Sequence, residues 1–141
     1  MRILSTRRGR WGLSVAAVVM LIFGIFYFCI HPRLSPDIVK IECQWLFHHP
    51  SVPFTATTDR RQIGQIAEVI RKGRPTAHPF SKLVPVAAIK IRDASGREQG
   101  WTLYKGGTLG EWGTGWDYHV GMEIERRLKD AFPLPVASPS E

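Results

Sequence analysis

The sequence predicts an α+β protein in which one N-terminal transmembrane helix precedes a small two-layer domain. Two observations predict this fold class. Residues 11–30 contain no charged side chain. The remainder alternates between segments with the two-residue period of strands and segments with the 3.6-residue period of amphipathic helices. The predicted element order is β-α-β-β-β-α, in which an antiparallel meander carries two helices on one face.

The apolar run at 11–30 is long enough to cross a lipid bilayer. Its twenty residues would form a helix of about 30 Å, the thickness of the hydrocarbon core. A cleaved signal peptide is the alternative, but this run exceeds the apolar core of such peptides and no small-residue cleavage pattern follows it. A twin-arginine export signal at Arg7 and Arg8 is disfavoured, because Arg10 occupies a position where an apolar residue is expected.

The distribution of charge predicts how this helix is oriented in the plasma (inner) membrane. The arginines that precede the apolar run are Arg2, Arg7, Arg8 and Arg10. Because positive residues remain on the cytoplasmic side, we expect a cytoplasmic basic tail at 1–10 and an extracytoplasmic α+β domain at 38–132. Residues 31–37, which include two prolines, are expected to form a short stiff linker. Residues 133–141 are expected to form a flexible tail.

Composition argues against two classes of protein. After the apolar run, 15 lysines and arginines (19 in the chain minus the four N-terminal arginines) face 12 acidic residues. The domain is therefore nearly balanced in charge, without the basic stripe that nucleic acid binding requires. Cys29 lies in the apolar run and Cys43 in a predicted strand. Cys43 has no partner in its own domain, so the domain is not a disulfide scaffold.

The first half of the domain is predicted to form a strand, a short second strand and a helix. Residues 38–47 alternate, which places one set of side chains on the core face: Val39, Ile41, Cys43, Trp45 and Phe47. A brief alternation at 52–56 predicts the short strand. The helix at 59–72 is expected to begin at Asp59, with Gln62 as its capping-box partner or Thr58 as the alternative cap, and to end at Gly73. Its apolar stripe consists of Ile63, Ile66, Ala67 and Ile70.

The second half is predicted to form three strands and a closing helix. The strand at 83–92 points Ala87, Ile89 and Ile91 inward. A type I turn at 93–96 leads to a returning strand at 98–105. After a turn at residues 106 and 107, a third strand broken by glycines is expected through 108–112 and 116–120. The helix at 122–132 groups on one face Ile124, Leu128 and either Ala131 or Phe132.

A run of aromatic residues interleaved with glycines is the strongest candidate for a binding site. Its members are Trp101, Tyr104, Trp112, Trp116 and Tyr118. Exposed aromatic side chains can stack against a sugar, a peptide or a partner protein, whereas buried ones would serve the core. Trp101 shares the core face with Leu103, so we assign it to the core and expect at least one of Trp112 and Trp116 to be exposed. The candidate binding surface therefore consists of Tyr104, Trp112, Trp116 and Tyr118.

The histidines do not form a recognisable metal or catalytic site. His48 and His49 are adjacent, so on a strand their side chains point to opposite faces. His78 and His119 lack further ligands at metal-like spacing. Asp117 shares a strand face with His119, but two residues make neither a metal site nor a catalytic triad. No catalytic, cofactor-binding or metal-binding residue is predicted.

Two further groups of side chains receive structural interpretations. The thiol of Cys43 is expected to point into the core, where apolar surroundings make it unreactive. The basic cluster Arg71, Lys72 and Arg74 follows the end of the predicted helix, where it complements the helix dipole and remains solvated. Contact between this cluster and anionic lipid head groups is the alternative.

These observations predict a single-pass, membrane-anchored protein of the cell envelope with a non-enzymatic interaction or sensing domain. Its expected partners are the lipid bilayer and an envelope protein, peptide or glycan, with no nucleic acid. An accessory subunit of a larger membrane complex is the first alternative, and a small envelope enzyme is the second. An enzyme would bring polar groups together in a deep pocket.

Overall fold

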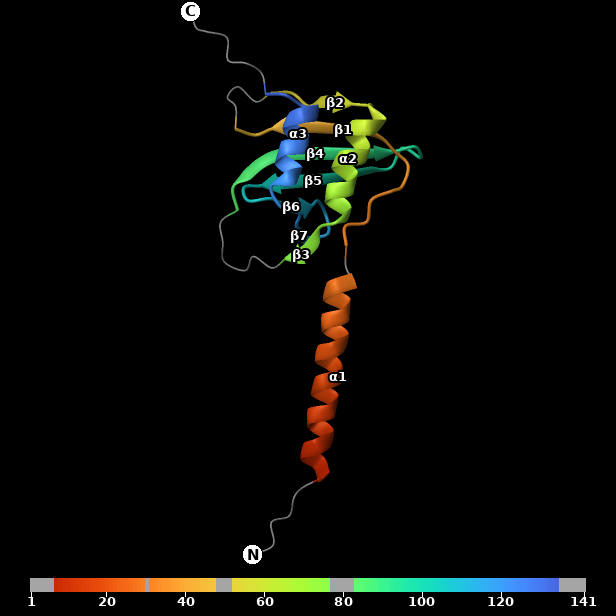
Figure 1. Ribbon diagram of the computed structural model, residues 1–141, viewed down its shortest axis with the longest axis vertical. Helices are drawn as coiled ribbons and strands as arrows, with labels where there is room; N and C mark the ends of the chain where they lie inside the picture. Colours follow the sequence, from red (N-terminus) through yellow and green to blue (C-terminus); the bar gives the residue numbers. More distant parts are fainter. Residues whose placement is uncertain (1–6, 30, 48–51, 77–82, 135–141) are drawn as a thin grey trace, which may run out of the picture. The chain divides into compact units, whose positions relative to one another are not determined.

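The computed structural model describes residues 7–29, 31–47, 52–76 and 83–134. The chain divides into two compact units, Met1–Ile30 and His31–Glu141. The first unit contains one helix, α1 (Arg7–Cys29), drawn in red in Figure 1. Within the part of the chain that the structure describes, no helix combines the length and the apolar character needed to cross a membrane.

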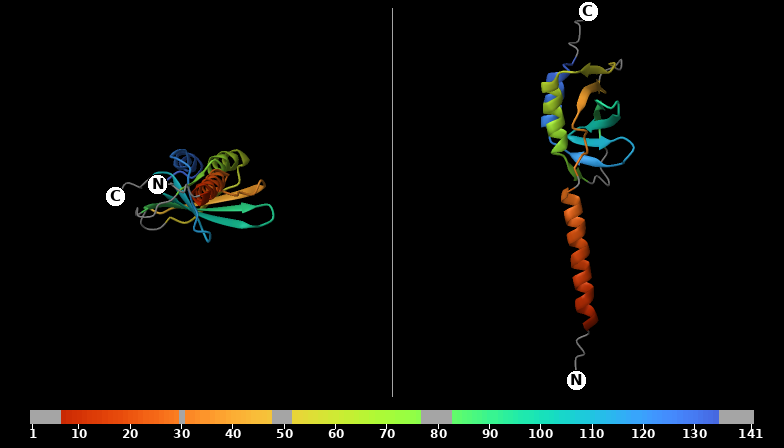
Figure 2. Two further views of the ribbon diagram at one scale, coloured as in Figure 1. Left: turned by 90° about the horizontal axis from the view of Figure 1, so that it is seen from below. Right: turned by 90° about the vertical axis from the view of Figure 1, so that its right-hand side faces the viewer.

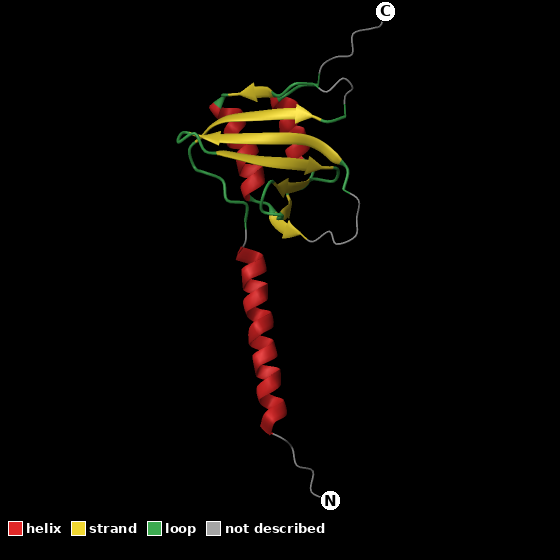
Figure 3. Cartoon of the chain, turned by 180° about the vertical axis from the view of Figure 1, so that it is seen from behind, coloured by secondary structure: helices red, strands yellow, loops and turns green. Residues whose placement is uncertain are grey.

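The second unit is an α+β sandwich, as the sequence predicts. Its described residues form one seven-stranded antiparallel sheet with the order β2-β1-β4-β5-β6-β7-β3. Helices α2 and α3 lie side by side on one face of this sheet, and the opposite face carries no helix (Figures 2 and 3). The elements are β1 (Ile38–Trp45), β2 (Thr55–Thr57), α2 (Arg60–Arg71), β3 (Arg74–Thr76), β4 (Pro85–Asp93), β5 (Glu98–Tyr104), β6 (Thr108–Glu111), β7 (Asp117–His119) and α3 (Glu123–Ala131).

The core lies between the sheet and the two helices. Alternate residues of β1, β4 and β5 supply one side of it, including Ile41, Ile89 and Trp101, all fully buried. The predicted stripe of α2 supplies much of the other side: Ile63, Ile66, Ala67 and Ile70. From α3 come Ile124 and Leu128, followed by Phe132, whereas Ala131 is only half-buried. Each buried aliphatic side chain stabilises the fold by about 1.5–3 kcal/mol relative to exposure.

The start of α2 confirms one predicted contact and corrects another. Asp59 is the N-cap, and its side chain accepts a hydrogen bond from the backbone N–H of Arg61 at 2.8 Å. The predicted capping box is not formed, because the Gln62 side chain accepts instead from the Thr57 hydroxyl at 2.7 Å. The Thr57 oxygen in turn accepts from the backbone N–H of Asp59 at 3.3 Å. Thr57, rather than Gln62, therefore accepts the hydrogen bond from the backbone N–H of the N-cap residue.

The turn between β4 and β5 is a hydrogen-bonded β-turn, as predicted, and its non-glycine residues have no positive φ, which agrees with type I. The Gly96 N–H donates to the Asp93 carbonyl at 3.0 Å, and Gly96 adopts a φ of 84° that a residue with a side chain rarely tolerates. The Asp93 carboxylate accepts from the Ser95 hydroxyl at 2.6 Å and from backbone N–H groups. These hydrogen bonds, that of the Ser95 hydroxyl first, lower the pKa of Asp93 despite some desolvation.

Two predicted core residues of the first strand are exposed. The register between β1 and β4 shifts between Ile38 and Lys40, as in a β-bulge, and the intervening Val39 is 45% exposed. An extra residue in a strand rotates its side chain out of the alternation. Phe47 is 53% exposed because β1 ends at Trp45. The prediction that both residues face the core is therefore wrong.

The predicted third strand of the meander is two strands. β6 and β7 pair with each other in antiparallel fashion, so the chain reverses direction between them. Gly113 and Gly115, with φ of 84° and 72°, make this reversal sterically accessible. β7 then pairs on its far side with β3, which the sequence does not predict as a strand. Pro75 is compatible with β3 because β3 is an edge strand.

Residues 31–37, expected to be a linker, are held against the domain, and we call them the strap. The strap carbonyls of Ser35 and Arg33 accept hydrogen bonds at 2.9 Å from the side chains of Arg71 and Gln99. The Asp37 carbonyl accepts from the backbone N–H of Ala94, also at 2.9 Å. His31 Nδ1 lies 3.0 Å from the Gly73 carbonyl oxygen. The strap is therefore part of the folded unit that begins at His31.

Candidate functional site

The candidate site lies on the helix-free face of the sheet. Trp101 and Leu103 of β5 point into the core and are fully buried. Because side chains alternate along a strand, Gly100, Thr102 and Tyr104 lie on the opposite face. Gly110 of β6 is paired with Thr102. These positions, together with Trp112 just after β6, form the surface that the aromatic run builds.

Trp112 is seated on a glycine of the neighbouring strand. A Cβ built on Gly100 would lie 1.9 Å from Cε3 of the Trp112 ring, so only glycine admits the ring at this position. The Trp112 backbone N–H donates to the Gly100 carbonyl at 2.9 Å. Its indole Nε1 donates to the Thr102 hydroxyl oxygen at 2.8 Å. The backbone and the ring of Trp112 are thus each fixed by a hydrogen bond, yet Trp112 remains 46% exposed.

Tyr104 is seated in the same manner on a second glycine. A Cβ built on Gly110 would lie 3.0 Å from Cε2 of the Tyr104 ring and 2.8 Å from Oδ1 of Asp117. Tyr104 is half-buried, and the Asp117 carboxylate reaches the surface beside its ring. Thr102, paired with Gly110, lies between the two seats. A pre-positioned aromatic ring is therefore accompanied by a hydroxyl and a carboxylate that can hydrogen-bond a ligand.

Trp116 and Tyr118 have different environments although both follow the same turn. The Trp116 carbonyl accepts from the Glu111 N–H at 2.9 Å and closes the β6–β7 hairpin, and its side chain is 46% exposed. Tyr118 is buried in the core against Trp101, with ring centroids 6.0 Å apart at a tilt of 58°. Burial first, and then the charge of Glu111, raises the pKa of Tyr118. The prediction that Tyr118 belongs to the binding surface is therefore wrong.

The register explains this correction. Tyr118 pairs with Leu109, which faces the core, whereas its neighbours Asp117 and His119 pair with residues on the opposite face. In one continuous strand through 108–120, residues 109 and 118 could not pair with each other. The predicted single strand therefore does not place Tyr118 opposite Leu109.

The predicted residues that lie on the helix-free face are Tyr104 and Trp112, which we call the aromatic surface. Trp116 is exposed as well, but it lies opposite Glu111, whose partner Trp101 faces the core. The role of the aromatic surface in binding stays a prediction.

Charged side chains extend the helix-free face beyond the aromatic surface. Lys90, which is paired with Gly100, lies 4.6 Å from the centroid of the Phe54 ring in a cation–π contact. Farther along the same face, Arg92 donates to Glu98 at 2.9 Å, and this hydrogen bond is the main cause of the lowered pKa of Glu98. The aromatic surface therefore has a solvated, mixed-charge border.

The remaining predicted candidates that the structure describes are not gathered into a chemical centre. His48, His49 and His78 lie outside the described residues, and His119 is exposed beside Arg74 in register. In the described ranges, no group of three or more histidines, cysteines or acidic residues could hold a metal ion. Cys43 is buried, which raises the pKa of its thiol to about 12. It therefore stays protonated and unreactive.

The predicted basic cluster does not act as a unit. Lys72 forms an ion pair with Glu68 at 2.6 Å, one turn back along α2. Arg71 instead donates to the strap, and Arg74 opens β3. Sequence reasoning also missed Gly100, Thr102 and Gly110 as the seats of the aromatic rings. Glycines inside strand-like segments were the available signal, because they often mark close approach of another group.

Neither a scan of protein-family models nor searches of curated proteins and solved structures found a match to this chain.

Proposed function

We propose that this chain is a membrane-anchored, non-enzymatic binding protein of the cell envelope whose aromatic surface engages its partner. The observation that carries the proposal is the seating of Trp112. A large exposed aromatic ring is held by a glycine seat and an indole hydrogen bond, and a backbone hydrogen bond fixes the residue that carries it. Fixing the ring before binding reduces the conformational entropy that binding would otherwise cost.

The proposed anchor is supported by the sequence and by the apolar side chains of α1. All twenty residues at 11–30 are uncharged. Large apolar side chains that follow one another around the helix are exposed, namely Val18, Val19, Met20, Leu21, Ile22 and Phe23. A helix that is apolar on every side needs an apolar environment. Because arginines precede this helix and positive residues remain on the cytoplasmic side, we propose a cytoplasmic N-terminus and an extracytoplasmic domain.

A binding role fits the aromatic surface better than catalysis does. Its polar groups, Thr102 and Asp117, are spread over a flat sheet face and accompany a ring, as in surfaces that stack on a sugar or a peptide. Thr102 already accepts from Trp112, which leaves its hydroxyl hydrogen as the group it can offer to a ligand. The proposed partner is therefore an envelope peptide, protein or glycan that presents a flat apolar face.

Site-specific photocrosslinking in the cells that make the protein tests this function. We expect Trp112→benzoylphenylalanine to form a discrete covalent adduct in the envelope fraction. Arg61→benzoylphenylalanine, at an exposed position of α2 on the opposite face of the sheet, should not form it. Equal adducts at both positions, or none at position 112, would contradict the proposal.

A further inference from the structure

A second surface lies on the helix side of the domain, away from the aromatic surface. It is a groove of about 600 Å³ between α2 and residues 36–39, where the strap continues into β1. Its apolar floor includes Ile38, Val39, Ile63 and Ala67. Val39 lies here because the β-bulge turns it out of the core, which leaves it 45% exposed. Ala94, from the β4–β5 turn, completes the lining.

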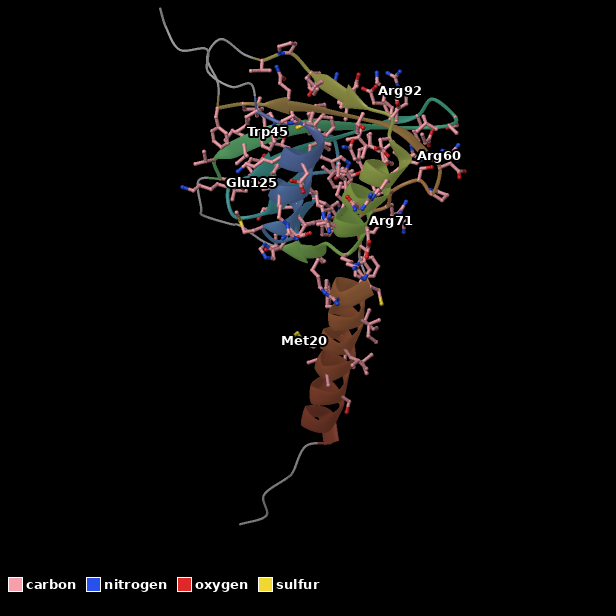
Figure 4. All side chains as sticks on the ribbon, turned by 45° about the horizontal axis from the view of Figure 1, so that its top comes forward. Met20, Trp45, Arg60, Arg71, Arg92 and Glu125 are labelled. Carbon is pink, nitrogen blue, oxygen red and sulfur yellow. The ribbon has the colours of Figure 1, made fainter. Side chains whose placement is uncertain are left out.

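The two ends of the groove are marked by arginines on one face of α2. Arg60 and Arg71 both line it, and Figure 4 shows them toward the two ends of the helix. The eleven residue steps from Arg60 to Arg71 make about three turns, so these side chains share a face and their backbones lie about 16 Å apart. Neither has an ion-pair partner within the described residues, and Arg71 uses one guanidinium N–H to hold Ser35. The one acidic residue in the lining is Asp37.

Gly64 keeps the middle of the groove open. It is exposed in the interior of α2, where glycine costs about 1 kcal/mol relative to alanine. Its φ is not positive, and a Cβ built on it meets no atom within 4 Å. Neither backbone conformation nor packing within the domain therefore requires glycine. What the missing side chain provides is room for another backbone to approach the helix between the arginines.

We propose that this groove binds an extended acidic peptide segment of a partner protein. The peptide backbone passes over Gly64 and Ala67, and two carboxylates reach Arg60 and Arg71. An extended chain rises about 3.3 Å per residue, so acidic residues four to six positions apart match the spacing of the arginines. Arginine forms bidentate hydrogen bonds with carboxylates, which gives this recognition its geometry.

Fluorescence anisotropy of the full chain in detergent micelles tests the proposal. The probe is a labelled peptide, Ser-Glu-Ala-Val-Ala-Glu-Ser, and the control probe carries Gln in place of both Glu. We expect the acidic probe to bind and the control probe to bind at least about tenfold more weakly. The double variant Arg60→Gln, Arg71→Gln should weaken binding about tenfold or more. The matched variant Arg61→Gln, which removes a charge from α2 outside the groove, should change it less than about twofold.

Gly64→Leu separates the groove from general electrostatic attraction. Leucine favours helix, so α2 is retained while its side chain fills the groove, and we expect binding to be lost without a fall in Tm. Unchanged binding by this variant, an equal effect of Arg61→Gln, or no binding of the acidic probe would overturn the proposal. Vesicles of anionic phosphatidylglycerol provide the competing occupant. Vesicle binding that depends on Arg60, Arg71 and Gly64 while the peptide does not bind would overturn it in favour of lipid.

Discussion

The two faces of the sheet use tryptophan in opposite ways. Trp101 faces the helices, is fully buried and packs against Tyr118. Trp112 lies on the helix-free face against Gly100, the residue just before Trp101, and is 46% exposed. Neighbouring positions of β5 therefore serve opposite faces: Trp101 points into the core, whereas Gly100 supports the exposed ring of Trp112. The difference teaches that aromatic content alone does not identify a binding surface, because strand alternation and helix placement decide which ring reaches solvent.

The polar atoms of the two indoles sharpen this comparison. Trp101 Nε1 is buried without a hydrogen-bond partner among the described residues, whereas Trp112 Nε1 donates to Thr102. An unsatisfied buried N–H costs about 1–3 kcal/mol. The apolar contacts of Trp101 must outweigh that cost, so its role is packing. The hydrogen bond of Trp112 instead fixes the orientation of an exposed ring.

The largest expected effect is the loss of the core tryptophan. Trp101→Ala leaves a cavity between the sheet and the helices, and we expect it to lower the free energy of unfolding by about 3–5 kcal/mol. Denaturant unfolding followed by circular dichroism measures this change. A loss below about 1 kcal/mol would mean that the two faces do not differ as described.

Removing the seat of the exposed ring should have a smaller effect. Gly100→Ala places a methyl group where the Trp112 ring lies, so the ring must leave its seat. We expect a loss of about 1–2 kcal/mol, within the range for overpacking, and a rise in acrylamide quenching of tryptophan fluorescence. Unchanged quenching would show that the ring does not rest on this glycine.

Removing the exposed ring itself should cost about 1 kcal/mol, because Trp112→Ala loses one hydrogen bond and partial burial. The double variant Gly100→Ala, Trp112→Ala should be no less stable than either single variant. Both changes disrupt the same contact, so their effects should not add. Additive losses in the unfolding free energy would contradict the seat. The quenchable fraction of the fluorescence should fall in Trp112→Ala.

The smallest effect concerns the border of the helix-free face. The Arg92 hydrogen bond lowers the pKa of Glu98 below its ordinary value of 4.5. The pair therefore stabilises the fold at pH above the unfolded pKa, and this contribution is lost as the pH falls through the lower folded pKa. We expect the Tm difference between the wild type and Glu98→Gln to be small at about pH 6 and to vanish once the pH lies below the folded pKa of Glu98. A difference that grows on acidification would reverse the assigned direction.

Much of the domain is predictable because its signals are local. The stripe of α2, its cap at Asp59 and the turn at 93–96 each depend on residues within a few positions of one another. The placement of Trp101 and Leu103 in the core follows from alternation alone. The exposure of Trp112 also agrees with expectation, although its seat on Gly100 does not follow from any local pattern.

By itself, the sequence determined the α+β class of the domain, the two amphipathic helices and the inward set of each central strand. Only the tertiary structure decided that β6 and β7 form a hairpin, that β7 pairs with β3, and that Tyr118 enters the core. It also decided that the bulge at Val39 opens a groove beside Gly64. The reason is physical: helix and strand periodicity arises between near neighbours, whereas pairing and ring seating depend on segments that meet only after the chain has folded.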